Sequence, residues 1–218
     1  MKKLLLILLC LPLMTLAQQT YVPDDAFEAY LEANGMGDGI TLNDSVFTSA
    51  IDTVTFLNVG SKGIFDLTGI EDFIALTNLY CLYNQLTSLD VSQNTALIDF
   101  RCQNNQLTSL DLSNNTALSI LWSANNQFTT LDVSNNAALT KLKCEYNQLT
   151  SLDVSGATAL TILKCDNNQL TSLDISNNIA LTSLTCFNNQ LTTLDVSTNT
   201  ALIELICYNN QLTTLDVS

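Results

Sequence analysis

A period of 21 residues dominates the chain and limits what it can fold into. Leucine, asparagine and aspartate each recur at this spacing in seven successive units. The three columns are Leu76, Leu97, Leu118, Leu139, Leu160, Leu181 and Leu202; Asn84, Asn105, Asn126, Asn147, Asn168, Asn189 and Asn210; and Asp90, Asp111, Asp132, Asp153, Asp174, Asp195 and Asp216. A fixed short period is the signature of stacked repeats. One 21-residue coil cannot enclose a core, so the sequence predicts an elongated array whose coils bury one another's apolar edges.

One unit, residues 97–117, shows how a coil is built. The alternation of apolar and polar residues around Phe100 and Cys102 predicts a short strand. The run DLSNNTA that follows is rich in turn formers and predicts tight turns or a single 3₁₀ turn. Neighbouring strands about 4.8 Å apart would then form one parallel sheet along the inner face. We expect Asn105 and its equivalents to be buried, with amides that bond backbone groups of their own coil and of the next one.

The copies CQNNQLTSLDLSNNTAL, CEYNQLTSLDVSGATAL and CFNNQLTTLDVSTNTAL begin at residues 102, 144 and 186. They resemble secreted bacterial leucine-rich repeat proteins of the internalin-like kind, over about residues 54–218. The resemblance implies a right-handed leucine-rich repeat solenoid with a parallel β-sheet on the concave face and turns or 3₁₀ on the convex face. It also implies extracellular protein recognition or adhesion, without a named ligand.

The first 17 residues match a secretory signal peptide. Lys2 and Lys3 precede the apolar run LLLILLCLPLM, and small residues end at Ala17. Cleavage there would remove both lysines and change the formal charge from −14 to −16. The minor alternative is a lipid-attachment cysteine at Cys10, although Leu9 stands where lipoprotein signals have a small residue. The sequence therefore predicts an exported protein, secreted or on the cell surface, and shows no later segment able to span a bilayer.

The two ends of the array differ from its middle. Residues 18–53 are expected to form a small helical N-terminal cap, because Pro23, Asp24 and Asp25 mark a helix start and Gly35 a helix stop. Residues 54–75 form a degenerate first coil with one inserted residue, and the 21-residue units then run to Ser218, where the last unit is incomplete. We expect this end to continue into further repeats or to be covered.

Six cysteines of the mature chain occupy one column of the repeat, with Ser123 in the unit that lacks one. They are Cys81, Cys102, Cys144, Cys165, Cys186 and Cys207. Parallel, in-register side chains do not bond easily, so free buried thiols are favoured over disulfides. The chain has no histidine, which excludes Ser-His-Asp and Cys-His catalysis and weakens any zinc site. We therefore expect that the protein is not an enzyme and that it has no cofactor and no metal site.

The outward strand positions vary from unit to unit while the core columns hardly change. They hold the single Trp and four of the five basic residues left after cleavage, and exposed aromatic and basic groups are typical of binding surfaces. Trp122 is expected to offer a large rigid contact to the partner, and its loss should change the stability of the fold little, because the ring is not in the core. The predicted partner-binding residues are Tyr80, Arg101, Trp122, Lys143, Lys164, Phe187 and Tyr208.

These features favour a non-catalytic recognition or adhesion module that binds a protein, rather than a glycan, through its concave face. The alternative is a structural spacer or surface-coat element without a specific ligand. A third idea, an ice-matched surface, comes from the regular hydroxyl column that includes Thr108 and Thr129. The strongly acidic composition argues against nucleic acid and anionic lipid as partners.

Overall fold

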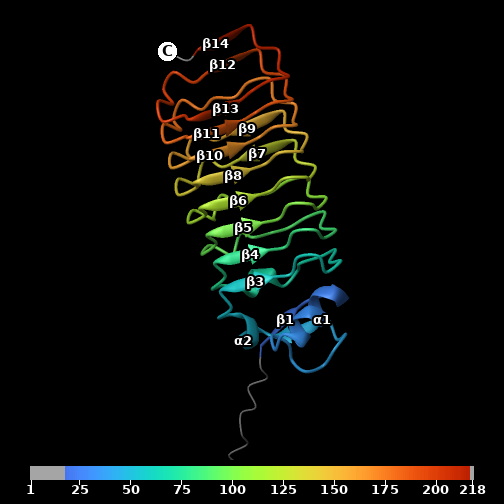
Figure 1. The fold of residues 1–218 in the computed structure, drawn as a ribbon. Coiled ribbons are helices and arrows are strands. Elements are labelled where there is room, and N and C mark those ends of the chain that lie inside the picture. Colours follow the sequence, from blue (N-terminus) through green and yellow to red (C-terminus); the bar gives the residue numbers. More distant parts are fainter. Residues whose placement is uncertain (1–17, 217–218) are drawn as a thin grey trace, which may run out of the picture.

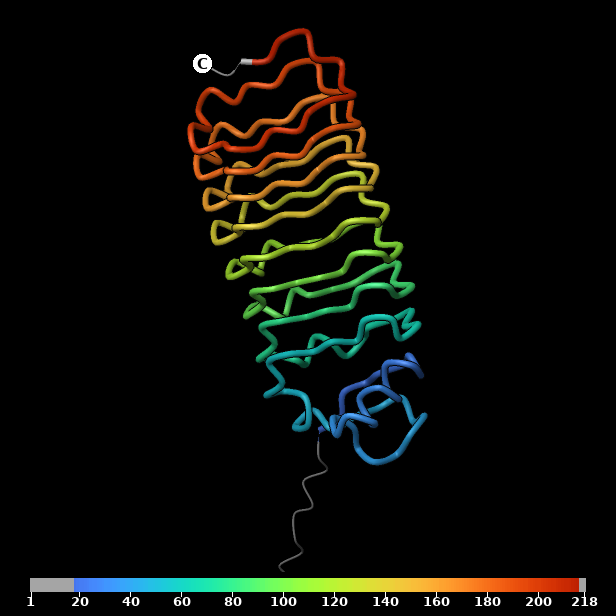
Figure 2. The backbone as a smooth tube through the Cα atoms, viewed as in Figure 1, coloured from blue at the N-terminus to red at the C-terminus, as the bar shows by residue number. Residues whose placement is uncertain are grey.

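The structure is a computed structural model that describes residues 18–216, so the predicted signal peptide lies outside the described residues. The coils stack one on another in a nearly straight column with the N-terminal segment at one end (Figures 1 and 2). This arrangement confirms the predicted solenoid. The division of the chain at residues 17, 53 and 75 stays a prediction.

One wall of the column is an eight-stranded parallel sheet with one strand from each coil. Pairing is in register at a shift of 21 residues, except for the shift of 22 between Leu57 and Leu79 that reflects the predicted insertion. The strand order is β3-β4-β5-β6-β8-β10-β11-β13. These strands are β3 (Phe56–Asn58), β4 (Asn78–Tyr80), β5 (Asp99–Arg101), β6 (Ile120–Trp122), β8 (Lys141–Lys143), β10 (Ile162–Lys164), β11 (Ser183–Thr185) and β13 (Glu204–Ile206).

Another part of each coil departs from the prediction of turns alone. Four coils form further short strands there, which pair in parallel as two separate ribbons. In β7 the exposed Thr130 and Asp132 flank the buried Leu131, so this segment also alternates like a strand. The strands are β7 (Thr130–Asp132) with β9 (Ser151–Asp153), and β12 (Thr193–Asp195) with β14 (Thr214–Asp216).

The remaining corner of each coil consists of tight turns, as predicted. In one unit the N–H of Asn94 donates to the carbonyl of Val91, and the N–H of Leu97 donates to the carbonyl of Asn94. The one 3₁₀ helix of the described residues, η1 (Ile70–Asp72), lies in the first coil. The aspartate column caps the turns, because Asp111 Oδ1 accepts from the N–H of Ser113 at 2.9 Å. This bond is the main reason that the pKa of Asp111 is lowered.

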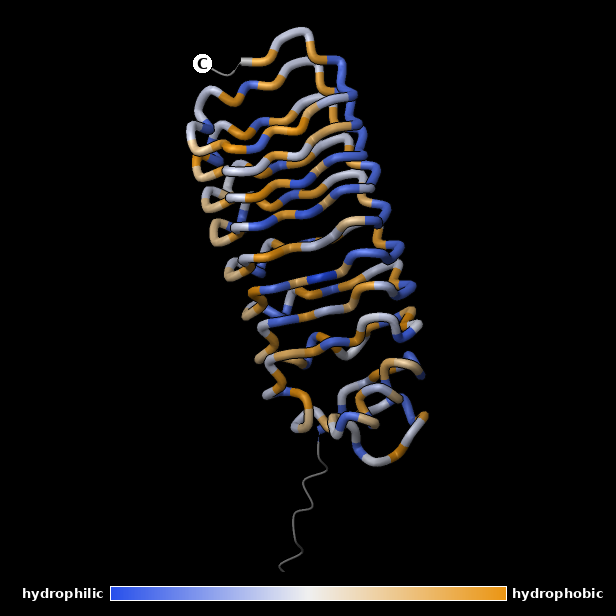
Figure 3. The backbone as a smooth tube through the Cα atoms, viewed as in Figure 1, coloured by the Kyte–Doolittle hydropathy of each residue, from blue (hydrophilic) through white to orange (hydrophobic). Residues whose placement is uncertain are grey.

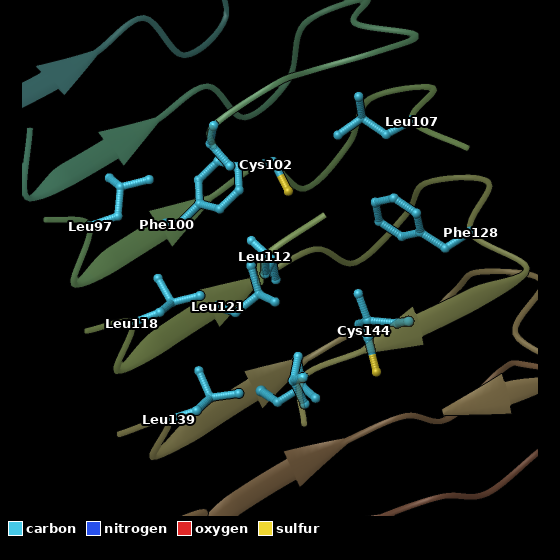
Figure 4. Packing of buried hydrophobic residues seen from close by; sticks show 14 of the residues in the cluster. Leu97, Phe100, Cys102, Leu107, Leu112, Leu118, Leu121, Phe128, Leu139 and Cys144 are labelled. Carbon is cyan, nitrogen blue, oxygen red and sulfur yellow. The ribbon is translucent and has the colours of Figure 1, made fainter. Parts of the chain in front are cut away.

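The core runs the length of the column between these walls. Apolar and polar residues alternate along the coils (Figure 3), and the leucine columns turn inward together with Phe100 and Phe128 (Figure 4). Both phenylalanines are fully buried. Each coil therefore buries apolar area mainly against the coils above and below it, as a repeat array requires.

Asn105 shows that the predicted amide column is present, but that its amides bond to a different neighbouring coil from the one predicted. Its Nδ2 donates to the carbonyls of Cys81 and Cys102, each at 3.0 Å, and its Oδ1 accepts from the N–H of Leu86 at 3.1 Å. Cys81 and Leu86 belong to the preceding coil, so the amide joins its own coil to the previous one rather than to the next. Most members of the column are buried, while Asn147 and Asn210 are half-buried.

A second asparagine column, which the sequence reasoning read only as turn formers, supports the corner of the coils. Its members are Asn94, Asn115, Asn136, Asn178 and Asn199, all at most 2% exposed. Asn115 Nδ2, for example, donates to the carbonyls of Val91 and Asn94 in the preceding coil. In the unit that has Ala157 at this place, Gly156 lies so close to Ser134 that an added Cβ would overlap its carbonyl oxygen. Any side chain at this position would therefore require the backbone to shift.

The N-terminal segment closes the first coil. It consists of β1 (Gln19–Tyr21), α1 (Asp25–Ala33), β2 (Ser45–Phe47) and α2 (Thr48–Ile51), with β1 and β2 antiparallel. Asp24 caps the first turn of α1 through Oδ1 and accepts from the N–H groups of Phe65 and Asp66 through Oδ2. One carboxylate thus starts the predicted helix and ties it to the first coil.

Cysteine side chains follow the strands as the predicted inward column. All six are free in the described residues, and all but Cys207 are buried. Burial raises the pKa of Cys102 to about 12 and also raises the pKa of Cys81, Cys144, Cys165 and Cys186, so these five thiols stay protonated at neutral pH. They act as small apolar groups, consistent with the prediction.

Candidate interaction face

The outward residues of seven strands of the sheet, from β4 to β13, form a surface that we call the sheet face. It has three columns, taken from successive alternate positions of each strand and its continuation. The first column is Asn78, Asp99, Ile120, Lys141, Ile162, Ser183 and Glu204; the middle column is Tyr80, Arg101, Trp122, Lys143, Lys164, Thr185 and Ile206; and the distal column is Leu82, Gln103, Ala124, Glu145, Asp166, Phe187 and Tyr208. Of the predicted binding residues, five lie in the middle column, and Phe187 and Tyr208 lie in the distal one.

Arg101 is held in place by a buried carboxylate. Its Nε and Nη2 donate to Asp99 at 3.0 and 2.8 Å, and the hydroxyl of Tyr80 donates to the same carboxylate at 2.8 Å. Asp99 is only 6% exposed, and this is the one ion pair among residues 18–216. The pKa of Arg101 is raised by the bond to Asp99. The guanidinium therefore serves the fold, and its charge is already paired.

Trp122 lies between two cations. The guanidinium of Arg101 and the ammonium of Lys143 each lie 4.0 Å from its ring centre, and they come from the strands on either side. Arg101 also stacks on Tyr80 at 4.3 Å, and Tyr80 meets Phe56 edge to face at 5.3 Å. The result is a continuous stack from β3 to β8, which we call the cation–aromatic stack, formed by Phe56, Tyr80, Arg101, Trp122 and Lys143.

This arrangement alters the role expected for Trp122. The ring is half-buried, its faces are occupied, and its Nε1 is buried without an acceptor. Each cation–π contact contributes about 0.5–1 kcal/mol or more, so truncating Trp122 should cost the fold about 1–2 kcal/mol. The sequence predicted little effect of this truncation on stability, whereas the two cation contacts predict a loss.

Charged side chains gather next to the stack on β8 and β10. Lys143 and Lys164 are neighbours in the middle column, and Glu145 and Asp166 are neighbours in the distal column. Burial, with Asp166 nearby, raises the pKa of Glu145. Glu145 Oε2 is buried without a hydrogen-bond donor, and neither lysine forms an ion pair within the part of the chain that the structure describes. Four charges without an ion pair thus meet on one small area, where Asp166 accepts a hydrogen bond from the Asn167 amide at 2.7 Å.

The C-terminal end of the sheet face is aromatic. Phe187 and Tyr208 stack with ring centres 4.7 Å apart and planes 12° apart. Phe187 is half-buried, whereas Tyr208 is 57% exposed. The predicted binding residues therefore form two groups, the stack with its neighbouring charges and this aromatic pair.

The sheet face has no net charge, although the chain is strongly acidic. Its basic residues are Arg101, Lys141, Lys143 and Lys164, and its acidic residues are Asp99, Glu145, Asp166 and Glu204. All but four of the 21 acidic residues therefore lie elsewhere. Over residues 18–216 no helix has the length and apolar character needed to cross a membrane. Within the same residues no group of three or more His, Cys, Asp or Glu could hold a metal ion.

Comparison with known proteins places these features among leucine-rich repeat proteins. No family model matches the chain. Internalin J of Listeria monocytogenes serotype 4b (strain F2365) is 41% identical over 75 residues, which is 34% of this chain and 8% of that protein.

Two solved structures extend the likeness to nearly the whole chain. The functional domain of InlJ from Listeria monocytogenes, which includes a cysteine ladder, is 35% identical with a TM-score of 0.67 over 92% of this chain and 50% of that one. Internalin C2 from the same species has a TM-score of 0.77 at 23% identity over 91% of each chain, a likeness of fold. The chain spans about half of the InlJ domain and a small part of full internalin J.

Proposed function

We propose that this chain, an internalin-like leucine-rich repeat protein, is an exported, non-catalytic recognition or adhesion module that binds a protein partner through its sheet face. The observation that carries the proposal is the cation–aromatic stack. The only Trp and two of the five basic residues of the described part lie in contact on one face, next to two more lysines.

The stack suits binding because its side chains are already ordered. Lysine and arginine lose considerable rotamer freedom when a partner immobilises them, at about 0.5–1.5 kcal/mol per side chain. Here Arg101 is fixed by Asp99 and Lys143 rests on Trp122, so part of that cost is met during folding. A sugar ring would need an open aromatic face, and both faces of Trp122 are covered. At the stack, which carries the proposal, a protein partner is therefore favoured over a glycan, whereas the exposed ring of Tyr208 would suit either.

A spacer without a ligand is the alternative, and it offers no reason for this arrangement. The packing of each coil on its neighbours is enough to stabilise a spacer, so a spacer would not need the contacts on the sheet face. Nothing in that role calls for unpaired charges beside a half-buried carboxylate at Glu145, or for the exposed ring of Tyr208. Desolvated, unpaired groups cost stability and are better accounted for by a partner that pairs them.

The proposal can be tested with cell binding. Beads coated with the full mature chain would be incubated with cells of the source organism and with cells to which that organism adheres, and the retained beads would be counted. Trp122→Ala/Lys143→Ala/Lys164→Ala should reduce binding at least tenfold, whereas Ser134→Ala on an outer turn should leave it unchanged.

Lys164→Glu supplies a control for folding, because Lys164 lies outside the stack. It should weaken binding while thermal denaturation stays close to that of the unaltered protein. Equal bead retention for all variants would refute the sheet face as the working surface and favour the spacer. N-terminal sequencing of the exported protein should begin at Gln18.

A further inference from the structure

We infer that the sheet face is complementary to itself and that its partner is a second copy of this chain, held face to face about a two-fold axis. The inference rests on the proposed function, because it uses the same face and names the partner.

The geometry follows from the register of the sheet. The middle and distal columns run side by side along the solenoid. Their residues are two positions apart in each coil, so the columns are about 6.6 Å apart. Consider a two-fold axis that is parallel to the long axis of the solenoid and lies midway between these columns. It places each middle residue opposite the distal residue of the same coil in the other copy. Both solenoids then point in the same direction, as they would side by side on one surface.

Charges match under this operation. Lys143 lies opposite Glu145 of the other copy, and Lys164 opposite Asp166. The two-fold axis repeats each of these two pairs, so four pairs of opposite charge form across the interface. In the single chain these carboxylates have no ion pair within the described residues, and Glu145 Oε2 has no donor. A purely acidic partner would suit the lysines but would be repelled by Glu145 and Asp166.

Shapes match as well. The largest side chain of the middle column, Trp122, lies opposite the smallest of the distal column, Ala124, because both belong to the coil that starts at Leu118. Arg101 lies opposite Gln103, whose Oε1 is buried without a donor. At the C-terminal end Ile206 meets Tyr208, which covers the exposed ring.

Size and charge set the expected strength. Seven strands about 4.8 Å apart and two columns with their side chains cover roughly 34 by 13 Å, about half the area that each partner contributes to a standard interface. The face is neutral, so the acidic remainder of the chain opposes association only from a distance and is screened by salt. We therefore expect a weak dimer that forms at high local concentration.

Charge-reversal variants give the test. Lys143→Glu/Lys164→Glu makes the four-residue cluster acidic throughout, and Glu145→Lys/Asp166→Lys makes it basic throughout. In sedimentation equilibrium at up to about 0.5 mM, the unaltered chain should dimerise, and each variant alone should self-associate at least tenfold more weakly. A 1:1 mixture should associate more tightly than the unaltered chain, and the fourfold variant with all charges exchanged should dimerise again.

Asp166 is only 5% exposed, so a lysine there could unfold the chain, and circular dichroism of each variant controls for this. The single variants Lys143→Glu and Glu145→Lys, which leave Asp166 unchanged, can then be mixed 1:1 for the same test. Monomers in both the unaltered chain and the mixtures would overturn the inference, while loss of cell binding in Lys164→Glu would still support the proposed function. Dimers that ignore all charge reversals would assign self-association to another surface and also overturn it.

Discussion

Removing the amide of Asn126 tests the main polar support of the coil stack. Asn126 is 8% exposed, and its Nδ2 donates to the carbonyls of Cys102 at 3.0 Å and Ser123 at 3.2 Å. Its Oδ1 accepts from the N–H of Leu107 at 3.0 Å. Asn126→Ala would leave the N–H of Leu107 without a partner, whereas the carbonyls of Cys102 and Ser123 keep the amides of Asn105 and Asn147.

The expected loss follows from these contacts. An unpaired buried polar group costs about 1–3 kcal/mol, and the alanine leaves a space that water can partly enter. This cost applies once, to the N–H of Leu107, so Asn126→Ala should lower the free energy of unfolding by about 2 kcal/mol.

Asn210→Ala is the matched control, because Asn210 makes the equivalent bonds to Cys186, Cys207 and Leu191 but is only half-buried. Water can replace its bonds, so about 1 kcal/mol is expected there. Urea denaturation followed by circular dichroism would measure both. Equal losses for the two variants, or a loss below about 0.5 kcal/mol for Asn126→Ala, would refute the reasoning that burial between coils sets the cost.

Three further predictions follow from the same structure. Gly156→Ala should destabilise the fold by about 1–3 kcal/mol, since its Cβ would overlap the backbone of Ser134 and cannot be relieved by a rotamer change; a neutral effect in thermal denaturation would contradict this close approach. All six thiols should alkylate after unfolding without reductant and slowly before it, with the half-buried Cys207 first, as mass spectrometry would show; no labelling after unfolding would mean disulfides. The pKa of Asp111 is lowered in the fold, so its contribution is present above the unfolded pKa of about 3.9 and lost as the pH falls through the lower folded value. The stability of Asp111→Asn should consequently fall less between pH 5 and pH 2 than that of the unaltered chain, and an identical acid titration would contradict the turn-capping role.

Some features of the site could be predicted because they depend only on the position within a repeat. The strand of each coil, the outward columns and the gathering of basic residues near Trp122 all follow from counting in steps of 21. The contacts among those side chains do not follow from counting. Whether Arg101 reaches Asp99, or Lys143 lies on Trp122, depends on rotamers chosen in the presence of both neighbouring strands.

The amide columns show the same division. The sequence identified Asn105 as buried and bonded, since a repeated polar residue in a core has to be satisfied. The predicted direction, toward the next coil, was wrong, because the distance between coils decides whether an amide reaches the coil before or after it. The column that includes Asn115 was missed although its repetition was visible, because asparagine beside serine and threonine is equally typical of an exposed turn.

The sequence by itself determined the solenoid, the length of a coil, the core columns, the helical start of the N-terminal segment and the position of the sheet face. Each of these is local or strictly periodic, so every repeat states it again. Only the tertiary structure decided which coils pair a second strand, why the backbone of Ser134 leaves no room for a Cβ at residue 156, and how the cations enclose Trp122. Those features arise between coils, where a few tenths of an ångström in spacing select one hydrogen bond or ring contact over another.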